Sequence, residues 1–331
     1  AKTLFPYTTL FRSAGGSACL GLPPMAHCRR GLMPLGRGKM LKQICVCALL
    51  VLGAARAQAA PFCVLSVEET SGTLAILTPQ GALRARLALG PRPHEIAVNA
   101  AGDTAYVSMF GIADYDNRIG TPGTTVAQID LGSARQTGVF AMPADVQGPH
   151  GVKMRPAGAG GPTELFVNTE VGGDAMLVFD IKSHALLRRF ALPPATHNFI
   201  FSGDGALVFS FAGARGVTKT DATTGKALAS HDYGVPVRGL LMAPDGTLLA
   251  GAKDVVLVID TGDLSVIRRL PTPRAGQVVY LDRLPDGTIF APAIGAKHCS
   301  IFGISTEQGA LRIAPAWAGG KRTDGPAALL G

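Results

Sequence analysis

Three histidines stand at equivalent positions in short apolar segments, each opened by a glycine- or proline-marked turn. The segments are RPHEIAV at 92–98, GPHGVKM at 148–154 and ATHNFIF at 195–201. Three converging imidazoles with an open fourth position suit zinc, which lowers the pKa of a bound water to about 7 and so creates a nucleophile. We therefore consider a site in which His94, His150 and His197 hold zinc or another divalent metal.

The recurrence of these histidines leaves two other interpretations open. The Pro-His pair can be a structural habit of the repeat, in which each imidazole bonds a neighbouring backbone and stiffens the turn. The imidazoles can also bind a small ligand directly, because histidine is neutral or charged near pH 7 according to its surroundings. The sequence does not choose among the three.

Further polar residues are predicted at the same end of the molecule. Arg238 takes the histidine position in a later segment, VPVRGLLM at 235–242. A long insertion at 111–123 adds Asp114, Tyr115 and Asp116. Together with the histidines, these residues predict a pocket for a small molecule at one mouth of a central channel.

Two carboxylates lie close to the histidines in the sequence or the repeat. Glu170 ends the predicted strand LFVNTE (165–170) and is the candidate general base, with a solvated loop charge as the alternative. Glu95 follows His94 directly, and neighbouring side chains of a regular strand point to opposite faces. We therefore expect Glu95 to point away from the pocket.

The segments that carry these residues belong to a repeat of about 40 residues. Six equivalent segments occur, the last three at 235–242, 273–281 and 324–331. Each repeat contains four short runs rich in Val, Ile, Leu and Phe and bounded by Gly, Pro, Asp or Ser, which is typical of strands. A period near 40 with four strands predicts an all-β fold, a β-propeller of six four-stranded blades.

Turn residues support this assignment. Asp-Gly pairs at 202–205, 243–246 and 284–287 suit tight hairpins, because both residues tolerate left-handed dihedral angles. Asp130, Asp180 and Asp260 end predicted third strands, where a carboxylate can accept hydrogen bonds from the next turn.

The two ends of the repeat region predict how the ring closes. The region opens with a second strand, FCVLSVE at 62–68, and finishes with a first strand, PAALL at 326–330. We expect these terminal strands to complete one blade together. A ring of seven blades, with the last one truncated, is the alternative.

Residues before Ala60 have a different character. Residues 1–39 resemble translated adapter and upstream sequence without periodicity. Residues 40–59 have the order of a secretory signal peptide: Lys42, an apolar run at 44–55 and the small residues Ala57-Gln58-Ala59. Residues 60–331 are then a single exported propeller domain, periplasmic or secreted, without a membrane span after cleavage.

The formal charge of +8 belongs to the leader, since residues 1–59 hold eight Lys or Arg and no acid. The balanced remainder gives no sign of a nucleic-acid partner. Cys63 and Cys299 are the thiols outside the leader. They are candidates for a disulfide between the first and last blades, with two buried thiols not bonded to each other as the alternative.

Several segments resemble YVTN-family β-propellers, secreted bacterial proteins similar in pattern to lactonase-like propellers. The matching segments are PHEIAV followed by AYVS (105–108), GPHGV followed by LFVNTE (165–170), and VLVIDT (256–261). The resemblance implies a propeller over 60–331 and specifies no activity, because this architecture hosts unrelated functions.

We interpret the chain as an exported, monomeric binding or scaffold protein, and an enzyme is the less favoured class. Its partner is a small molecule or an envelope protein or peptide. The alternative is a metal-assisted lyase or lactone hydrolase, with the three histidines as ligands and Glu170 as proton acceptor. The sequence has no G-x-S-x-G, Walker, dinucleotide-binding or haem-attachment motif.

Overall fold

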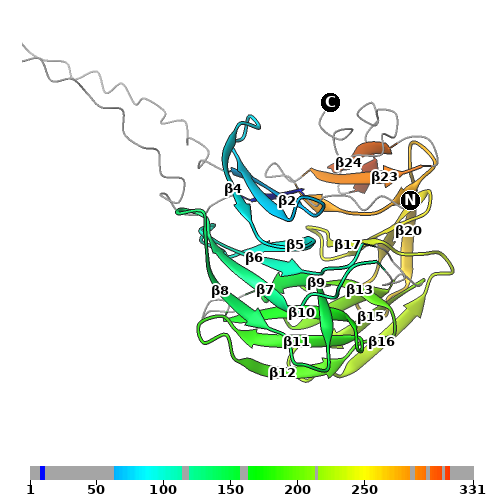
Figure 1. The fold of residues 1–331 in the computed structure, drawn as a ribbon. Helices are drawn as coiled ribbons and strands as arrows, with labels where there is room; N and C mark the ends of the chain where they lie inside the picture. The colour runs from blue at the N-terminus through cyan, green and yellow to red at the C-terminus, as the bar shows by residue number, and fades with distance from the viewer. Residues whose placement is uncertain are drawn as a thin grey trace, which may run out of the picture.

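The computed structural model describes residues 8–11, 63–113, 119–156, 163–212, 215–283, 288–295, 299–307 and 310–313. Over this part of the chain the regular elements are all β-strands, which form six antiparallel sheets of consecutive strands. Figure 1 shows the sheets following one another around a ring, so the predicted six-bladed propeller is confirmed.

The first three blades each contain four strands. Blade 1 consists of β1 (Thr8–Phe11), β2 (Cys63–Glu68), β3 (Thr73–Leu77) and β4 (Leu83–Ala88). Blade 2 consists of β5 (Pro93–Val98), β6 (Thr104–Met109), β7 (Thr125–Asp130) and β8 (Arg135–Ala141). Blade 3 consists of β9 (Gln147–Met154), β10 (Glu164–Val171), β11 (Ala175–Asp180) and β12 (Leu186–Ala191).

The last three blades repeat this order, and blade 6 has an interrupted first strand. Blade 4 consists of β13 (Thr196–Phe201), β14 (Leu207–Ala212), β15 (Gly216–Asp221) and β16 (Ala227–Asp232). Blade 5 consists of β17 (Gly239–Met242), β18 (Leu248–Ala252), β19 (Val255–Ile259) and β20 (Val266–Pro271). Blade 6 consists of β21 (Gln277–Val278), β22 (Asp282–Arg283), β23 (Ile289–Ile294), β24 (Cys299–Glu307) and β25 (Ala310–Ile313).

The hydrophobic core lies between blades. Five clusters of buried apolar side chains each draw on two successive blades. Phe140 of blade 2 meets Phe179 of blade 3 with ring centroids 5.6 Å apart, and Phe166 meets Phe201 of blade 4 at 4.8 Å. A sheet that is apolar on both faces is buried only by packing on similar sheets, and this requirement favours the ring.

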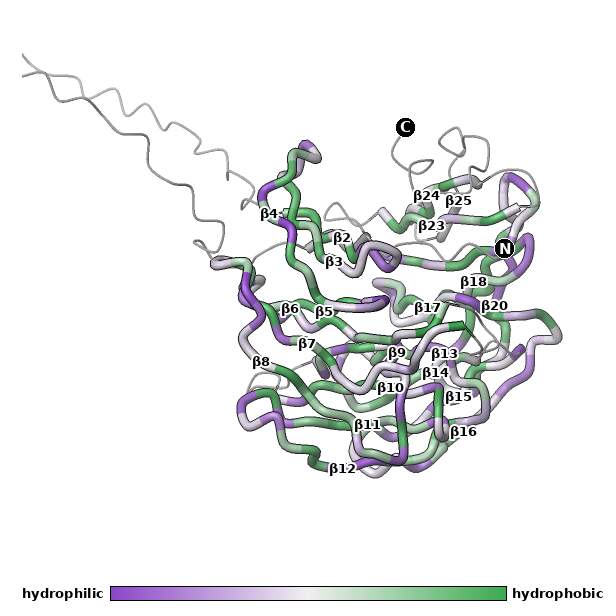
Figure 2. The backbone as a smooth tube through the Cα atoms, in the orientation of Figure 1, coloured by the Kyte–Doolittle hydropathy of each residue, from purple (hydrophilic) through white to green (hydrophobic). Residues whose placement is uncertain are grey.

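The hydropathy of the chain differs between the inner strands and the outer parts of the blades. Hydrophobic stretches lie on the inner strands, and hydrophilic residues are more frequent at the turns and on fourth strands such as β12 (Figure 2). A search of the described residues for a helix of membrane-spanning length and hydropathy finds none.

The turns form as their residues predict. The Oδ1 atoms of Asp130, Asp180 and Asp260 accept hydrogen bonds from the backbone amides of Ser133, Ser183 and Gly262, at 2.6, 2.7 and 2.6 Å. Gly205 and Gly246 end two Asp-Gly turns with φ of 70° and 83°. The third such turn, at 284–287, lies outside the described residues.

The strand beside β2 differs from the expectation. β1 pairs antiparallel with β2, with Thr8 opposite Ser66 and Phe11 opposite Cys63. The sequence predicted 326–330 in this place, and those residues lie outside the described part of the chain. An edge strand exposes unpaired backbone groups, and TTLF, with β-branched and aromatic residues, is a suitable partner. These four residues of the 1–39 segment therefore take part in the sheet.

Candidate functional site

The three equivalent histidines lie side by side on the first strands of blades 2, 3 and 4. The ring centroids of His94 and His150 are 4.2 Å apart, and those of His150 and His197 are 4.1 Å apart. Both pairs are tilted by 45°, so the rings form a continuous row with His150 in the middle. We call these three residues the histidine row.

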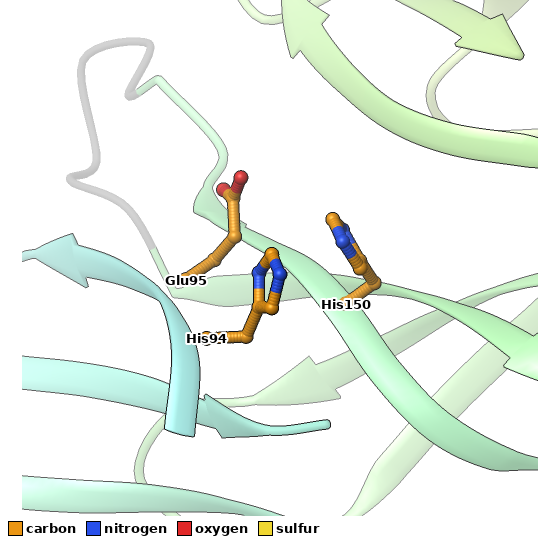
Figure 3. A group of neighbouring side chains, drawn as sticks. All are labelled: His94, Glu95 and His150. Atoms are coloured by element: carbon orange, nitrogen blue, oxygen red, sulfur yellow. The ribbon is translucent and has the colours of Figure 1, made fainter. Parts of the chain in front are cut away.

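A β-bulge in blade 2 orients the first member of the row. Pro93 pairs with Met109 and Ile96 with Val107, so His94 and Glu95 together oppose the single residue Ser108. A bulge interrupts the alternation of side chains and redirects them. The expectation that Glu95 points away from His94 is therefore wrong: donor atoms of His94, Glu95 and His150 lie within 4.8 Å of one another (Figure 3).

The next two blades have a bulge at the same place. In blade 3, Pro149 pairs with Thr169 and Val152 with Val167, which leaves His150 and Gly151 opposite one residue. In blade 4 the register also shifts, between Thr196 and Asn198, at His197. Each histidine of the row thus belongs to an irregular point of its strand.

Burial makes two of the histidines neutral. The side chains of His94 and His150 are 2% and 0% exposed, and the ring of Phe110 makes a T-shaped contact with each. Burial, with the nearby His197 as a second cause, lowers the pKa of His94 to about 3. The same two causes lower the pKa of His150 well below its ordinary value. Both rings therefore offer nitrogen lone pairs at neutral pH.

Glu170 joins the row from β10. Its Oε1 lies 3.0 Å from Nδ1 of His197 and 3.8 Å from Nδ1 of His150. The side chain is 16% exposed, so it is a largely buried carboxylate rather than a solvated loop charge. This position suits either a proton acceptor or a metal ligand.

Glu95 is held by two residues that sequence reasoning missed. Asn198 donates from Nδ2 to Oε1 of Glu95 at 2.5 Å, and Lys153 donates from Nζ to Oε2 at 3.2 Å. Both partners come from other blades. Their signal in the sequence is a single polar residue inside an apolar strand, Lys153 in GVKM and Asn198 in THNFIF.

A second layer of polar residues fixes the backbone of the row. Ser108 donates from Oγ to the carbonyl oxygen of His150 at 2.6 Å. Asn168 accepts from the amide of Gly151 at 2.9 Å and donates to the carbonyl oxygen of His197 at 3.3 Å. A Cβ on Gly151 would overlap the amide oxygens of Asn168 and Asn198, so only glycine fits here.

A cavity of about 300 Å³ lies where the first strands of blades 2 to 6 meet, and we call it the central cavity. Its wall is mostly apolar. The polar residues in the wall are Lys153, His197, Asn198, Arg238, Tyr280 and Asp282. His197 is the member of the histidine row that reaches the cavity, whereas His94 and His150 are buried behind it. Burial raises the pKa of Asp282.

The remaining predicted site residues are distributed as follows. Arg238 lines the central cavity beside His197, as its place in the repeat predicts. Asp114, Tyr115 and Asp116 lie outside the described residues. Cys63 begins β2 and Cys299 begins β24, in the first and last blades, and the side chain of Cys299 is outside the described part. Their disulfide stays a prediction.

Two groups of side chains have the composition of a metal site. They are His94 with Glu95 and His150, and His150 with Glu170 and His197, and the donor atoms of each group lie within 4.8 Å of one another. Each group thus offers two imidazoles and one carboxylate, a set that binds zinc, iron and other transition metals in proteins.

Comparison with known proteins supports the fold and no activity. No family model matches the chain, and no curated protein matches it. Among solved structures, the chain is similar to the hydrazine synthase of Kuenenia stuttgartiensis, with a TM-score of 0.60 and 15% sequence identity over 73% of each chain. At this identity the likeness shows a common architecture alone.

Proposed function

We propose that the protein is an exported binding protein whose central cavity takes a small organic anion with an apolar body. The observation that carries this proposal is the presence of two cationic side chains, Lys153 and Arg238, in one mostly apolar cavity. A volume of about 300 Å³ is at the small end of ligand sites. His197 and Asn198 add polar groups that can orient the ligand.

Arg238 has the side-chain geometry that best suits the anionic group. The ammonium of Lys153 pairs with Glu95 at 3.2 Å. A guanidinium offers a planar pair of donors that matches a carboxylate. Burial raises the pKa of Asp282, the acidic residue in the same wall.

The wider setting of this role rests on the sequence. The predicted signal peptide at 40–59 favours a periplasmic or secreted protein, and the propeller architecture is by itself no evidence of catalysis. A small molecule is preferred to an envelope protein or peptide because the polar groups lie inside a cavity of limited volume. We propose that the protein acts as a monomer.

Calorimetric titration of the metal-free protein with small carboxylic acids and their methyl esters tests the proposal. We expect the acids to bind and the esters to bind at least roughly tenfold more weakly, as loss of one charge-assisted hydrogen bond implies. Arg238→Gln should abolish the preference, and the exposed Arg274→Gln should preserve it. Equal binding of acids and esters, or no binding by either series, would sink the proposal.

A second candidate is the metal-assisted lactone hydrolase or lyase, and the contact of Glu170 with two histidines favours it. In hydrolysis a water adds to the lactone carbonyl carbon while Glu170 accepts its proton, the ring C–O bond breaks, and the proton passes from Glu170 to the released ring oxygen. Zinc-loaded protein should then open lactones, and Glu170→Gln should lose this activity at zinc concentrations that saturate the variant. Absence of turnover across a panel of lactones would rule out the lactone hydrolase and leave the binding function as the proposal.

A further inference from the structure

We infer that His150, His197 and Glu170 form a mononuclear site for a divalent transition metal of the zinc class. The donor atoms have suitable spacing: Oε1 of Glu170 lies 3.0 Å from Nδ1 of His197 and 3.8 Å from Nδ1 of His150. Ligands about 2.0 to 2.1 Å from a tetrahedral zinc are about 3.4 Å apart. The observed distances fall on both sides of that value, so small side-chain shifts would complete the site.

The donor set selects the class of metal. Two imidazole nitrogens and one carboxylate oxygen suit Zn²⁺, Fe²⁺, Ni²⁺ and Cu²⁺. Mg²⁺ and Ca²⁺ prefer sites made of oxygen ligands. The site is therefore expected to bind zinc and to leave magnesium and calcium in solution.

The burial of His150 is a second, independent observation. Its side chain is 0% exposed, and neither ring nitrogen makes a hydrogen bond of good geometry with a described residue, although the ring interacts with the backbone of His197. Buried polar groups in proteins are nearly always paired, because an unsatisfied one opposes folding. A metal on Nδ1 would satisfy the nitrogen that faces Glu170.

The neighbouring residues explain why this group is favoured over His94, Glu95 and His150. Both oxygens of Glu95 accept hydrogen bonds, from Asn198 and Lys153. The group with Glu170 includes His197, which lines the central cavity and so offers the metal a route from solvent and an open position for water or ligand.

The surroundings of the site hold its ligands in place. Asn168 and Ser108 bond the carbonyl groups of His197 and His150. The ring of His94 packs against that of His150, tilted by 45° with the ring centroids 4.2 Å apart. Such outer contacts orient metal ligands and contribute to affinity. The bulges of blades 3 and 4 therefore bring His150 and His197 together, and the bulge of blade 2 places His94 beside His150.

Titration of the full-length, chelator-treated protein with Zn²⁺, Co²⁺, Mg²⁺ and Ca²⁺ tests the inference. We expect one Zn²⁺ per chain, a tetrahedral ligand-field spectrum with Co²⁺, and no competition from Mg²⁺ or Ca²⁺. Glu170→Gln and His197→Gln should each weaken zinc binding roughly 100-fold or more, at or beyond the upper end of the effects seen for outer-shell partners. The control His231→Gln lies in β16, outside the row, and should bind as wild type does.

Two features keep the outcome unambiguous. Thermal unfolding of each variant shows that it is folded, and the two Gln variants carry the test even if His150→Ala does not fold. Absence of stoichiometric zinc binding by wild type, or unchanged affinity in both Gln variants, would overturn the inference. Anion binding is measured on metal-free protein and depends on Arg238, so failure of the metal site leaves the proposed function intact.

Discussion

The molecule has two sets of β-bulges, and their distributions differ. Bulges between the third and fourth strands occur at the same register in blades 1 to 5, for example between Val178 and Phe179. Bulges between the first and second strands are described in blades 2, 3 and 4, the blades of the histidine row. In blade 5 the described pairing begins at Gly239, one residue after Arg238, and the amide of Arg238 donates to the carbonyl oxygen of Gly251 at 2.9 Å. The outer bulges thus recur through five blades, and the described inner bulges stand where the histidines stand.

This difference bears on the meaning of the recurring histidine. A structural habit of the repeat would recur wherever the strand pairing recurs, as the outer bulge does. The inner bulges instead accompany histidines whose donor atoms converge with those of Glu95 and Glu170. Perturbing the inner set should therefore affect stability and metal binding together, and perturbing the outer set should affect stability alone.

The largest expected effect is acid destabilisation by the buried row. The pKa of His94 is about 3 when folded and about 6.5 when unfolded, so the unfolded state binds more protons between these values. Stability is therefore lost as pH falls below 6.5. At roughly 1.4 kcal/mol per pKa unit, His94 alone costs about 3 kcal/mol at pH 4. Urea unfolding in chelator at pH 7, 5.5 and 4 measures this loss.

A variant without the buried imidazole isolates this contribution. His94→Leu should lose less stability than wild type over the same pH range, whereas the control His231→Gln should follow wild type. Parallel pH profiles of wild type and His94→Leu would assign the acid sensitivity to other groups.

Gly151→Ala should have the next largest effect, because its Cβ would push against the amide oxygens of Asn168 and Asn198 at the inner bulge. Overpacking of this kind costs about 1 to 3 kcal/mol. Zinc affinity should fall as well, since Asn168 bonds the backbone of His197. Gly203→Ala is the matched control, as an added Cβ there meets nothing within 4 Å. Equal urea midpoints of the two variants would contradict the prediction.

Lys153→Met should destabilise by about 2 kcal/mol, because it leaves the carboxylate of Glu95, which is 4% exposed, without its cation. The comparison is Arg189→Met, which removes the outer ion pair with Asp145. Those side chains are 44% and 61% exposed, and such pairs contribute little. Chemical denaturation of both variants measures the difference. Equal losses of unfolding free energy would show that the Lys153–Glu95 pair stabilises the protein no more than the exposed pair does.

The sequence predicted what depends on local chemistry and on the repeat. The period revealed the blades, the aspartates at strand ends revealed the turns, and equivalence of position brought His94, His150 and His197 together. It failed where one strand departs from regular alternation. Glu95 was assigned to the wrong face because nothing in RPHEIAV marks a bulge. Lys153 and Asn198 were missed because their partner Glu95 lies on another blade.

The smallest expected effect concerns the repeat itself. Asp130 accepts hydrogen bonds from the amide and the hydroxyl of Ser133, both at 2.6 Å, at an outer turn. Asp130→Ala should lower the free energy of unfolding by about 1 kcal/mol, the net contribution of a typical hydrogen bond. Asp130→Asn keeps the acceptor oxygen and should restore most of it. This turn joins the third and fourth strands of blade 2, whereas the inner bulges lie between first and second strands. Both variants should therefore bind zinc as wild type does. Weakened zinc binding in Asp130→Ala would show that the outer and inner regions are coupled.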